Sequence, residues 1–232
     1  TLDSIIQCGP LPTNALCALT SEVLSALDYI HERGVLHLDV KPLNVLISNS
    51  GSAKLSDFGS SLIGNNASRS VTSAFGPSQT SADENTFEVR GTARYVSPEM
   101  ARSEDPTPAC DMWSLGIMLL QMITGDDPWK QEGDGASMLP KDCGFQFMCR
   151  FLAQLGKKDD VLPAYIIENA LQVRQSQQER AGLSVDPPAS FAAVETVLLL
   201  AQRCIQRSPA DRITAAEAVT WTQERGITGA YT

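Results

Sequence analysis

Positive charge is the first thing that this sequence has little of. Its 232 residues include 18 lysines and arginines against 27 aspartates and glutamates, which gives a net charge of −9. The longest basic run is Lys157–Lys158, and two aspartates follow it at once, as is typical of a solvated surface. Proteins that bind nucleic acids need a basic patch to neutralise phosphates. We therefore expect no nucleic-acid partner.

Closely spaced cysteines and histidines are also missing. Six cysteines occur, but no two form a Cys-x-x-Cys pair, and the chain has only two histidines. Zinc sites draw their ligands from such residues at short spacing, so a zinc site is not expected. Unpaired thiols are typical of proteins in a reducing cytosol, and we therefore predict a cytoplasmic location.

Long hydrophobic runs are absent as well. The longest apolar stretch lies near 115–123 and is interrupted by Gln121, whereas a membrane-spanning helix needs about 20 apolar residues. The first ten residues, TLDSIIQCGP, have neither the basic region nor the apolar core of a signal peptide. We expect no membrane partner.

Hydrophobic periodicity predicts a mainly helical protein. Apolar residues make up 43% of the chain, which is enough for a sizeable core. Apolar residues spaced by three and four predict a helix at 13–33, and a segment that is apolar on nearly every face predicts a central helix at 110–125. Further helices are expected at 145–156, 190–205 and 214–222.

Three other segments have different compositions. Short apolar runs at 44–48 and 53–57, separated by NSGS, predict a small β-hairpin. Residues 60–90 lose periodicity and are rich in serine, threonine and asparagine, which predicts a long polar loop. The polar segment within 165–190 is interpreted as a surface insertion.

Five short motifs occur in a fixed order along the chain. They are HLDVKPLNVL at 37–46, DFG at 57–59, GTARYVSPEM at 91–100, DMWSLG at 111–116 and DR at 211–212. Their order and spacing resemble the C-terminal lobe of a eukaryotic protein kinase of the serine/threonine type. The resemblance implies one partial kinase domain at 1–232, mainly α (α+β), with a helical lobe, a small β-hairpin carrying the catalytic and metal-binding loops, an activation loop at 60–90, and no N-terminal β-lobe.

The resemblance assigns phosphoryl transfer to four polar residues. Asp39 would accept or orient the proton of the substrate hydroxyl, and Lys41 would steady the transferring phosphate. Asn44 and Asp57 would hold Mg²⁺ through hard oxygen ligands, which implies ATP and Mg²⁺ as cofactors. Taken alone, an Asp-x-Lys pair is usually a surface ion pair and DFG marks a turn. Between apolar strands, however, an unpaired charge would be costly.

The resemblance also implies contacts with nucleotide and substrate. Leu46 would form an apolar floor for adenine, and Thr1 would touch the ribose edge. Thr92 in the GTARY segment would bond Asp39 and Lys41 and hold the acid in place. Lys41 after LDV and Thr92 are typical of serine/threonine kinases rather than tyrosine kinases, so the expected partners are protein substrates that carry serine or threonine.

Other motif residues are expected to be structural. Three of them would align the site: His37, Phe58 and Gly59. Glu99 and Arg212 match a buried pair that ties the end of the activation loop to the lower part of the lobe. Asp111 matches a residue that braces the backbone of the catalytic loop. An acid is also favoured at any helix N-terminus, so simple capping remains an alternative for Asp111.

Two departures from the family pattern leave the function open. The chain has no Gly-x-Gly-x-x-Gly and no lysine before Lys41, so the residues that grip the nucleotide in the N-terminal lobe are missing. The chain is therefore either the catalytic lobe of a longer kinase, completed by an upstream chain, or a non-enzymatic interaction module derived from a kinase. Leu38 replaces the usual arginine, and without that cation we expect activity not to depend on loop phosphorylation.

Overall fold

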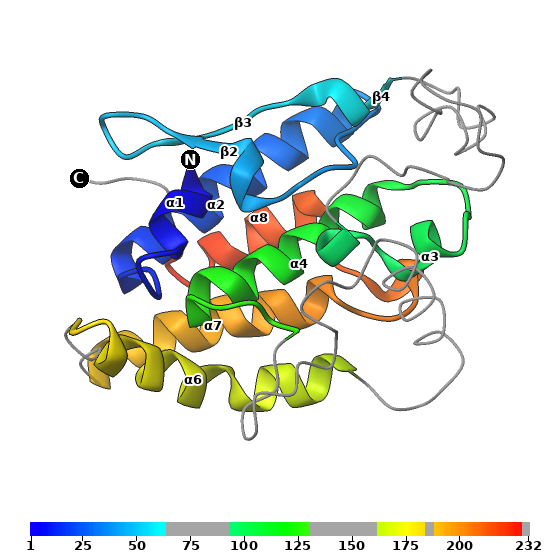
Figure 1. Ribbon diagram of the computed structural model, residues 1–232. Coiled ribbons are helices and arrows are strands. Elements are labelled where there is room, and N and C mark those ends of the chain that lie inside the picture. Colours follow the sequence, from blue (N-terminus) through cyan, green and yellow to red (C-terminus); the bar gives the residue numbers. More distant parts are fainter. Residues whose placement is uncertain (64–92, 130–161, 184–187, 229–232) are drawn as a thin grey trace, which may run out of the picture.

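The computed structural model describes residues 1–63, 93–129, 162–183 and 188–228 (Figure 1). This part of the chain is mostly helical, with two small sheets. The helices are α1 (Leu2–Ile6), α2 (Thr13–Glu32), α3 (Pro98–Ala101), α4 (Pro108–Thr124), α6 (Leu162–Arg180), α7 (Pro188–Cys204) and α8 (Ala215–Gln223). The strands are β1 (Val35–Leu36), β2 (Val45–Ile47), β3 (Ala53–Leu55) and β4 (Leu62–Ile63). No helix of the described part is long and apolar enough to cross a membrane.

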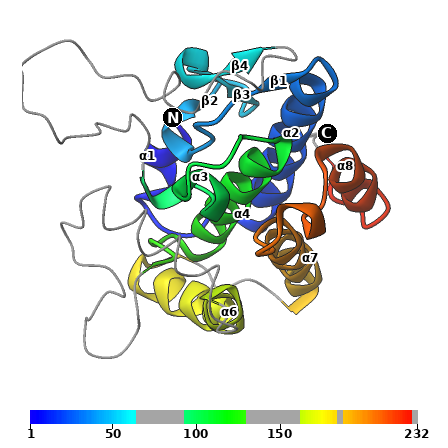
Figure 2. The same cartoon turned by 90° about the vertical axis from the view of Figure 1, so that its right-hand side faces the viewer.

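Helix α4 runs through the centre of the domain, with α2 on one side and α6 and α7 on the other (Figures 1 and 2). Every residue from Cys110 to Leu120 is buried, which confirms the predicted central helix. Gly116 allows α7 to pack closely, because a Cβ there would lie 2.8 Å from the Cβ of Cys204 on α7. The helix ends at Thr124 and is followed by Gly125, whose φ of 70° favours glycine.

Three further predicted helices are confirmed as α2, α7 and α8. Helix α2 buries the face that its apolar spacing predicted, including Leu16, Val23 and Leu27. Helix α8 begins with a capping box, in which Thr214 and Glu217 bind each other's backbone N–H groups. The helix predicted at 145–156 lies outside the described residues.

Two short antiparallel strand pairs bring the motif segments together. Strand β2 pairs with β3, with Leu46 opposite Lys54, which confirms the predicted hairpin. Strands β1 and β4 were not predicted, and they pair with Leu36 opposite Leu62. Because β1 ends just before His37 and β4 follows the DFG motif, this second pair joins the two segments expected to hold the site.

Helix α6 occupies much of the segment interpreted as a surface insertion, and it packs against α4. Although this helix is polar, its Arg174 and Gln178 are buried. Arg174 donates to the Ile123 carbonyl at 2.8 Å and to the Leu11 carbonyl at 2.7 Å. Carbonyls in the last turn of a helix lack partners within it. Arg174 therefore caps α4 and ties it to the segment before α2, and the insertion itself stays a prediction.

Replacing Arg174 with methionine is expected to lower the free energy of unfolding substantially. The substitution keeps an apolar stem but removes the donors of two buried carbonyls, each worth about 1–3 kcal/mol, so we expect a loss of about 3 kcal/mol. Urea denaturation followed by circular dichroism measures it. Arg180 is exposed on the same helix, so Arg180→Met should change stability by less than about 0.5 kcal/mol. Equal losses of stability in the two variants would show that the hydrogen bonds of Arg174 to the two carbonyls do not stabilise the fold.

Candidate active site

Asp39, Lys41 and Asn44 form one hydrogen-bonded group. Lys41 Nζ donates to Asp39 Oδ2 at 2.7 Å, and Asn44 Nδ2 donates to the same oxygen at 2.9 Å and to the Asp39 carbonyl at 2.8 Å. The side chains of Asp39 and Lys41 are 12% and 14% exposed, and Asn44 is buried. Asp39 Oδ1 accepts no hydrogen bond from the described part of the chain. The largely buried Asp39 carboxylate therefore has one oxygen, Oδ1, available to another ligand.

Asp111 holds the backbone that carries Asp39. Its buried carboxylate accepts hydrogen bonds from His37 N–H at 2.8 Å and from Leu38 N–H at 2.7 Å. The same carboxylate lies 2.8 Å from His31 Nε2 on α2. All three contacts reach outside α4, and within the described residues the carboxylate does not bond the N–H groups of its own helix. Asp111 therefore anchors the HLD segment to the centre of the domain.

His37 connects the HLD segment with the DFG segment. Its Nδ1 accepts from Asp39 N–H at 3.2 Å, and its Nε2 lies 3.0 Å from the Ser56 carbonyl. Because a backbone N–H can only donate and a carbonyl can only accept, Nε2 carries the ring proton. The ring centroid lies 4.8 Å from that of Phe58. Ser56 in turn donates its N–H and its hydroxyl to the Asn44 carbonyl, each at 2.9 Å. The two motif segments are thus fixed to each other.

Asp57 lies in the turn after β3 and is exposed, unlike Asp39. Its φ of 63° places it in the left-handed region, which residues other than glycine rarely adopt. Asp57 Oδ1 accepts from Gly59 N–H at 3.3 Å, and a Cβ at Gly59 would lie only 3.1 Å from this oxygen. Asp57 Oδ2 accepts no hydrogen bond within the described chain, so it is available to a ligand.

The residues assigned to the nucleotide lie at the edge of this group. Leu46 on β2 is 47% exposed, and Thr1 is exposed at the start of α1. Helix α1 contacts both β2 and the 3-10 turn η1 (Pro42–Asn44), so Thr1 and Leu46 belong to neighbouring elements (Figure 1). Thr92, which was expected to bond Asp39 and Lys41, lies outside the described residues.

Comparison with known protein families shows which family this chain belongs to. The family model described as the protein kinase domain matches residues 1–222. The chain belongs to the protein kinase family. The described site residues thus lie in a kinase domain, in agreement with the motif order of the sequence.

The relatives of this kinase chain include proteins from microbes and plants. The probable cAMP-dependent protein kinase catalytic subunit of Encephalitozoon cuniculi is 37% identical over 123 residues, which are 53% of this chain and 33% of the relative. Serine/threonine-protein kinase PknL of Mycobacterium tuberculosis is 38% identical over 132 residues, 57% of this chain and 29% of PknL. The 3-phosphoinositide-dependent protein kinase 1 of Arabidopsis thaliana is 35% identical over 132 residues, 57% of this chain and 26% of that protein. The chain thus spans a third or less of the length of these relatives.

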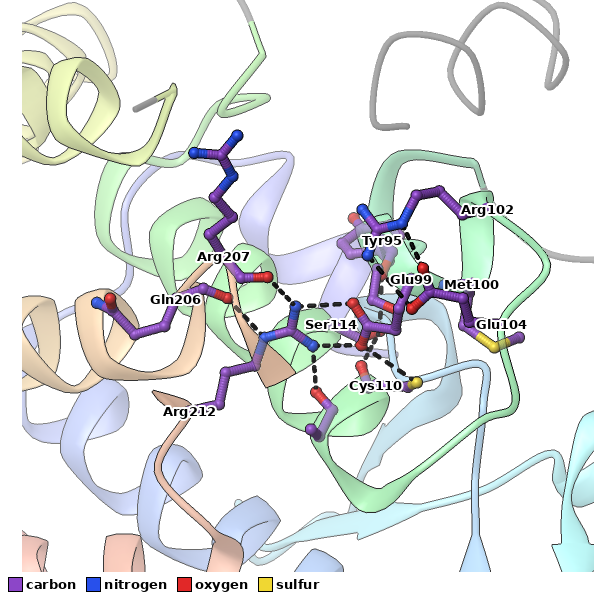
Figure 3. A network of polar contacts seen from close by, with 12 residues as sticks. Tyr95, Glu99, Met100, Arg102, Glu104, Cys110, Ser114, Gln206, Arg207 and Arg212 are labelled. Carbon is purple, nitrogen blue, oxygen red and sulfur yellow. Dashed lines mark hydrogen bonds and ion pairs between the residues drawn. The ribbon is translucent and has the colours of Figure 1, made fainter. Parts of the chain in front are cut away.

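A buried ion pair anchors the GTARYVSPEM segment of the kinase (Figure 3). Arg212 Nη2 donates to Glu99 Oε2 at 2.8 Å, and Arg212 Nη1 pairs with Glu99 Oε1. Other guanidinium N–H groups donate to the carbonyls of Gln206, Ala109 and Arg207. Burial acts to raise the pKa of Glu99, but the hydrogen bonds and charge of Arg212 outweigh it and hold this pKa below its usual value.

Cys110 completes the ion-pair network. Its thiol donates to Glu99 Oε1 at 3.3 Å, and burial together with the Glu99 charge raises the pKa of the thiol to about 12. A thiol with this pKa stays protonated at neutral pH and is a poor nucleophile. Cys110 is therefore a buried packing residue of the kinase rather than a reactive one.

Two side-chain oxygens of the candidate site are of the kind that a magnesium ion prefers. Asn44 turns its Nδ2 toward Asp39, which leaves Oδ1 without a hydrogen bond in the described chain, and Asp57 Oδ2 is also available. Mg²⁺ is usually held by one or two protein oxygens, substrate phosphates and water. Asn44 and Asp57 are therefore the residues that could hold the ion.

Sequence reasoning missed two residues that complete this kinase site. His31 bonds Asp111 from 80 positions away, and Ser61 Oγ donates to the His37 carbonyl at 3.3 Å. Neither residue belongs to a motif that was weighed. For His31, the chain's scarcity of histidine was a usable signal, since one of only two histidines lies on the inner part of α2. Ser61 could not be singled out, because the polar loop contains many serines and threonines.

Proposed function

We propose that this chain is the catalytic lobe of a serine/threonine protein kinase, which transfers a phosphoryl group from ATP to protein hydroxyls. The observation that supports this most is the Asp39 carboxylate, in which Lys41 and Asn44 hold Oδ2 while Oδ1 accepts no hydrogen bond from the residues that the structure describes. A substrate hydroxyl bound at Asp39 Oδ1 would be oriented for attack and would give its proton to this carboxylate.

Lys41 has two tasks in this proposal. Its Nζ donates to Asp39 Oδ2 at 2.7 Å and so fixes the direction of the carboxylate. The same ammonium group lies beside the place where the acceptor hydroxyl would bind, so it can stabilise negative charge on the transferred group. Because Lys41 is only 14% exposed, water screens this charge less than it would on the surface.

Asn44 Oδ1 and Asp57 Oδ2 are the protein oxygens that we assign to magnesium. The ion would neutralise the charge of the ATP phosphates when bound. The ties from Ser56 to the Asn44 carbonyl and from His37 to Ser56 keep the asparagine and the DFG segment at a fixed spacing. A fixed spacing is what a site needs in order to hold the reacting groups in line.

Leu46 and Thr1 would contact the nucleotide from one side only. We assign the opposite side of the nucleotide cleft to a part of the protein outside this chain. Leu46 on β2 and Phe58 of the DFG motif are 47% and 46% exposed, although both are large apolar side chains that burial would stabilise. The chain also lacks a lysine before Lys41 that could grip phosphates. We therefore propose that the lobe works within a longer cytoplasmic kinase whose N-terminal part covers Leu46 and Phe58.

Asp57→Asn is expected to abolish most metal-dependent phosphoryl transfer by the full-length protein. The amide keeps the shape but removes the only exposed charge assigned to the ion, so turnover should fall by about 100-fold or more. Transfer from labelled ATP to a mixed protein substrate, followed by phosphoamino-acid analysis, should give phosphoserine or phosphothreonine from the parent protein. Asp28→Asn on α2, where Asp28 bonds no described residue, is the control and should keep full activity. Predominant phosphotyrosine would contradict the substrate class, and transfer by no form of the protein would favour the interaction module.

A further inference from the structure

The peptide group between His37 and Leu38 is held at both of its polar atoms. Its N–H, which belongs to Leu38, donates to Asp111 Oδ1 at 2.7 Å. Its carbonyl, which belongs to His37, accepts from Ser61 Oγ at 3.3 Å. The N–H and C=O of a trans peptide point in opposite directions, so two different segments grip this peptide from its two sides.

This peptide sets the direction of the catalytic acid. Leu38 has a φ of 62°, a conformation that residues other than glycine keep only where the surroundings determine it. Asp39 is the next residue, so a rotation of the peptide would turn the Asp39 carboxylate away from Lys41 and Asn44. Asp111 restrains the N–H from the core, but only Ser61 among the described residues restrains the carbonyl from the other side.

Ser61 also belongs to the segment that carries the proposed metal ligand. It lies between the 3-10 turn η2 (Phe58–Ser60) and β4, four positions after Asp57, and is half-buried. Strand β4 pairs with β1, which leads directly into the HLD segment. The Ser61 hydroxyl therefore connects the segment of Asp39, where the substrate hydroxyl would bind, with the segment of Asp57, the proposed metal ligand. Leu38 has no charge or donor in its side chain, so it cannot provide such a connection by binding a phosphate.

We propose that Ser61 is a positioning residue of this kinase: its hydroxyl holds the His37–Leu38 peptide so that Asp39 faces the substrate while Asp57 faces the metal. The proposal rests on the kinase activity proposed above. A length of 3.3 Å is long for a hydroxyl–carbonyl bond. Hydrogen bonds of catalytic sites are often this long without substrate and shorten in the reacting complex.

Three substitutions in the full-length protein test the proposal kinetically. Ser61→Ala should lower kcat about tenfold, which equals about 1.4 kcal/mol in the barrier, and should change KM for ATP less than about twofold. Ser61→Thr keeps the hydroxyl and should stay within about threefold of the parent kcat. Ser60→Ala is the matched control, because the neighbouring Ser60 hydroxyl bonds no described residue, and it should change kcat less than about twofold.

Amide hydrogen exchange measured by NMR provides a second readout that does not need activity. In Ser61→Ala the Leu38 amide should exchange about tenfold faster, while amides in the centre of α4 keep their rates. Unchanged kcat and unchanged Leu38 exchange in Ser61→Ala would overturn the proposal. So would equal losses in Ser61→Ala and Ser61→Thr, because a hydroxyl would then not be the cause. If even the parent protein transfers no phosphate, the proposed function fails by itself, and the exchange of Leu38 alone decides whether Ser61 holds the peptide.

Discussion

Asp39→Asn is expected to reduce turnover of the full-length kinase by about a thousandfold. The substitution keeps the size of the side chain and leaves an amide oxygen able to accept from Lys41 or Asn44. What it removes is the negative charge and the ability to take the proton of the substrate hydroxyl at Oδ1. General-base catalysis by a positioned group contributes about 10²–10⁴-fold, which sets the size of the expected loss.

Steady-state kinetics at saturating ATP and substrate measures this loss. The effect should appear in kcat and not in KM for ATP, because Asp39 bonds its own loop and not the residues assigned to the nucleotide. Asp28→Asn carries the same change of charge at a half-buried position of α2 that bonds no described residue, and it should keep the parent kcat. If Asp39→Asn retained more than about a tenth of the activity, Asp39 would not be the base, and its contacts with Lys41 and Asn44 would be structural.

Helices with a strong pattern were predictable from the sequence. Helix α2 repeats apolar residues at three and four, and α4 is apolar on nearly every face, so both the elements and their burial followed from the local sequence pattern. Strands β1 and β4 contain two residues each, too few to show a period of two. Their pairing joins positions 36 and 62, and no local pattern indicates which distant segment a short strand will meet.

The motifs named the residues of the candidate site and two of their contacts, the Asp111 brace and the Glu99–Arg212 pair, but the other contacts were not predictable. The motif order pointed to Asp39, Lys41, Asn44 and Asp57, and the structure brings the first three into direct contact. The left-handed backbone of Leu38 gave no signal, because leucine does not favour positive φ and only tertiary contacts impose it. Buried Arg174 was interpreted as part of a polar surface, since a pattern of polar residues does not reveal an arginine that caps another helix.

Glu99→Gln is expected to lower the free energy of unfolding by about 3–5 kcal/mol at neutral pH. Glu99 and Arg212 are both almost completely buried, and the substitution leaves the guanidinium charge without its counter-charge. Arg102 and Glu104 form a comparable pair nearby, with Arg102 Nε 2.6 Å from Glu104 Oε1, but it lies near the surface (Figure 3). Glu104→Gln should therefore cost less than about 1 kcal/mol. Urea denaturation of both variants compares the two pairs directly.

The pH dependence of the stability difference between the parent protein and Glu99→Gln shows whether the substitution acts through the lost charge or through packing. Arg212 holds the pKa of Glu99 below its usual value in the folded protein, against the effect of burial, so the folded state binds the proton of this carboxyl less readily than the unfolded state does. The stability that the Glu99 charge contributes is fully present above the unfolded pKa of about 4.3 and is lost as the pH falls through the lower folded pKa. Protonated Glu99 is neutral, as glutamine is. The stability difference between the parent protein and Glu99→Gln should therefore be largest at pH 7 and clearly smaller at about pH 3. A difference that stays constant over this range would mean that the substitution acts through packing, and that the Glu99 charge contributes little to holding the GTARYVSPEM segment in place.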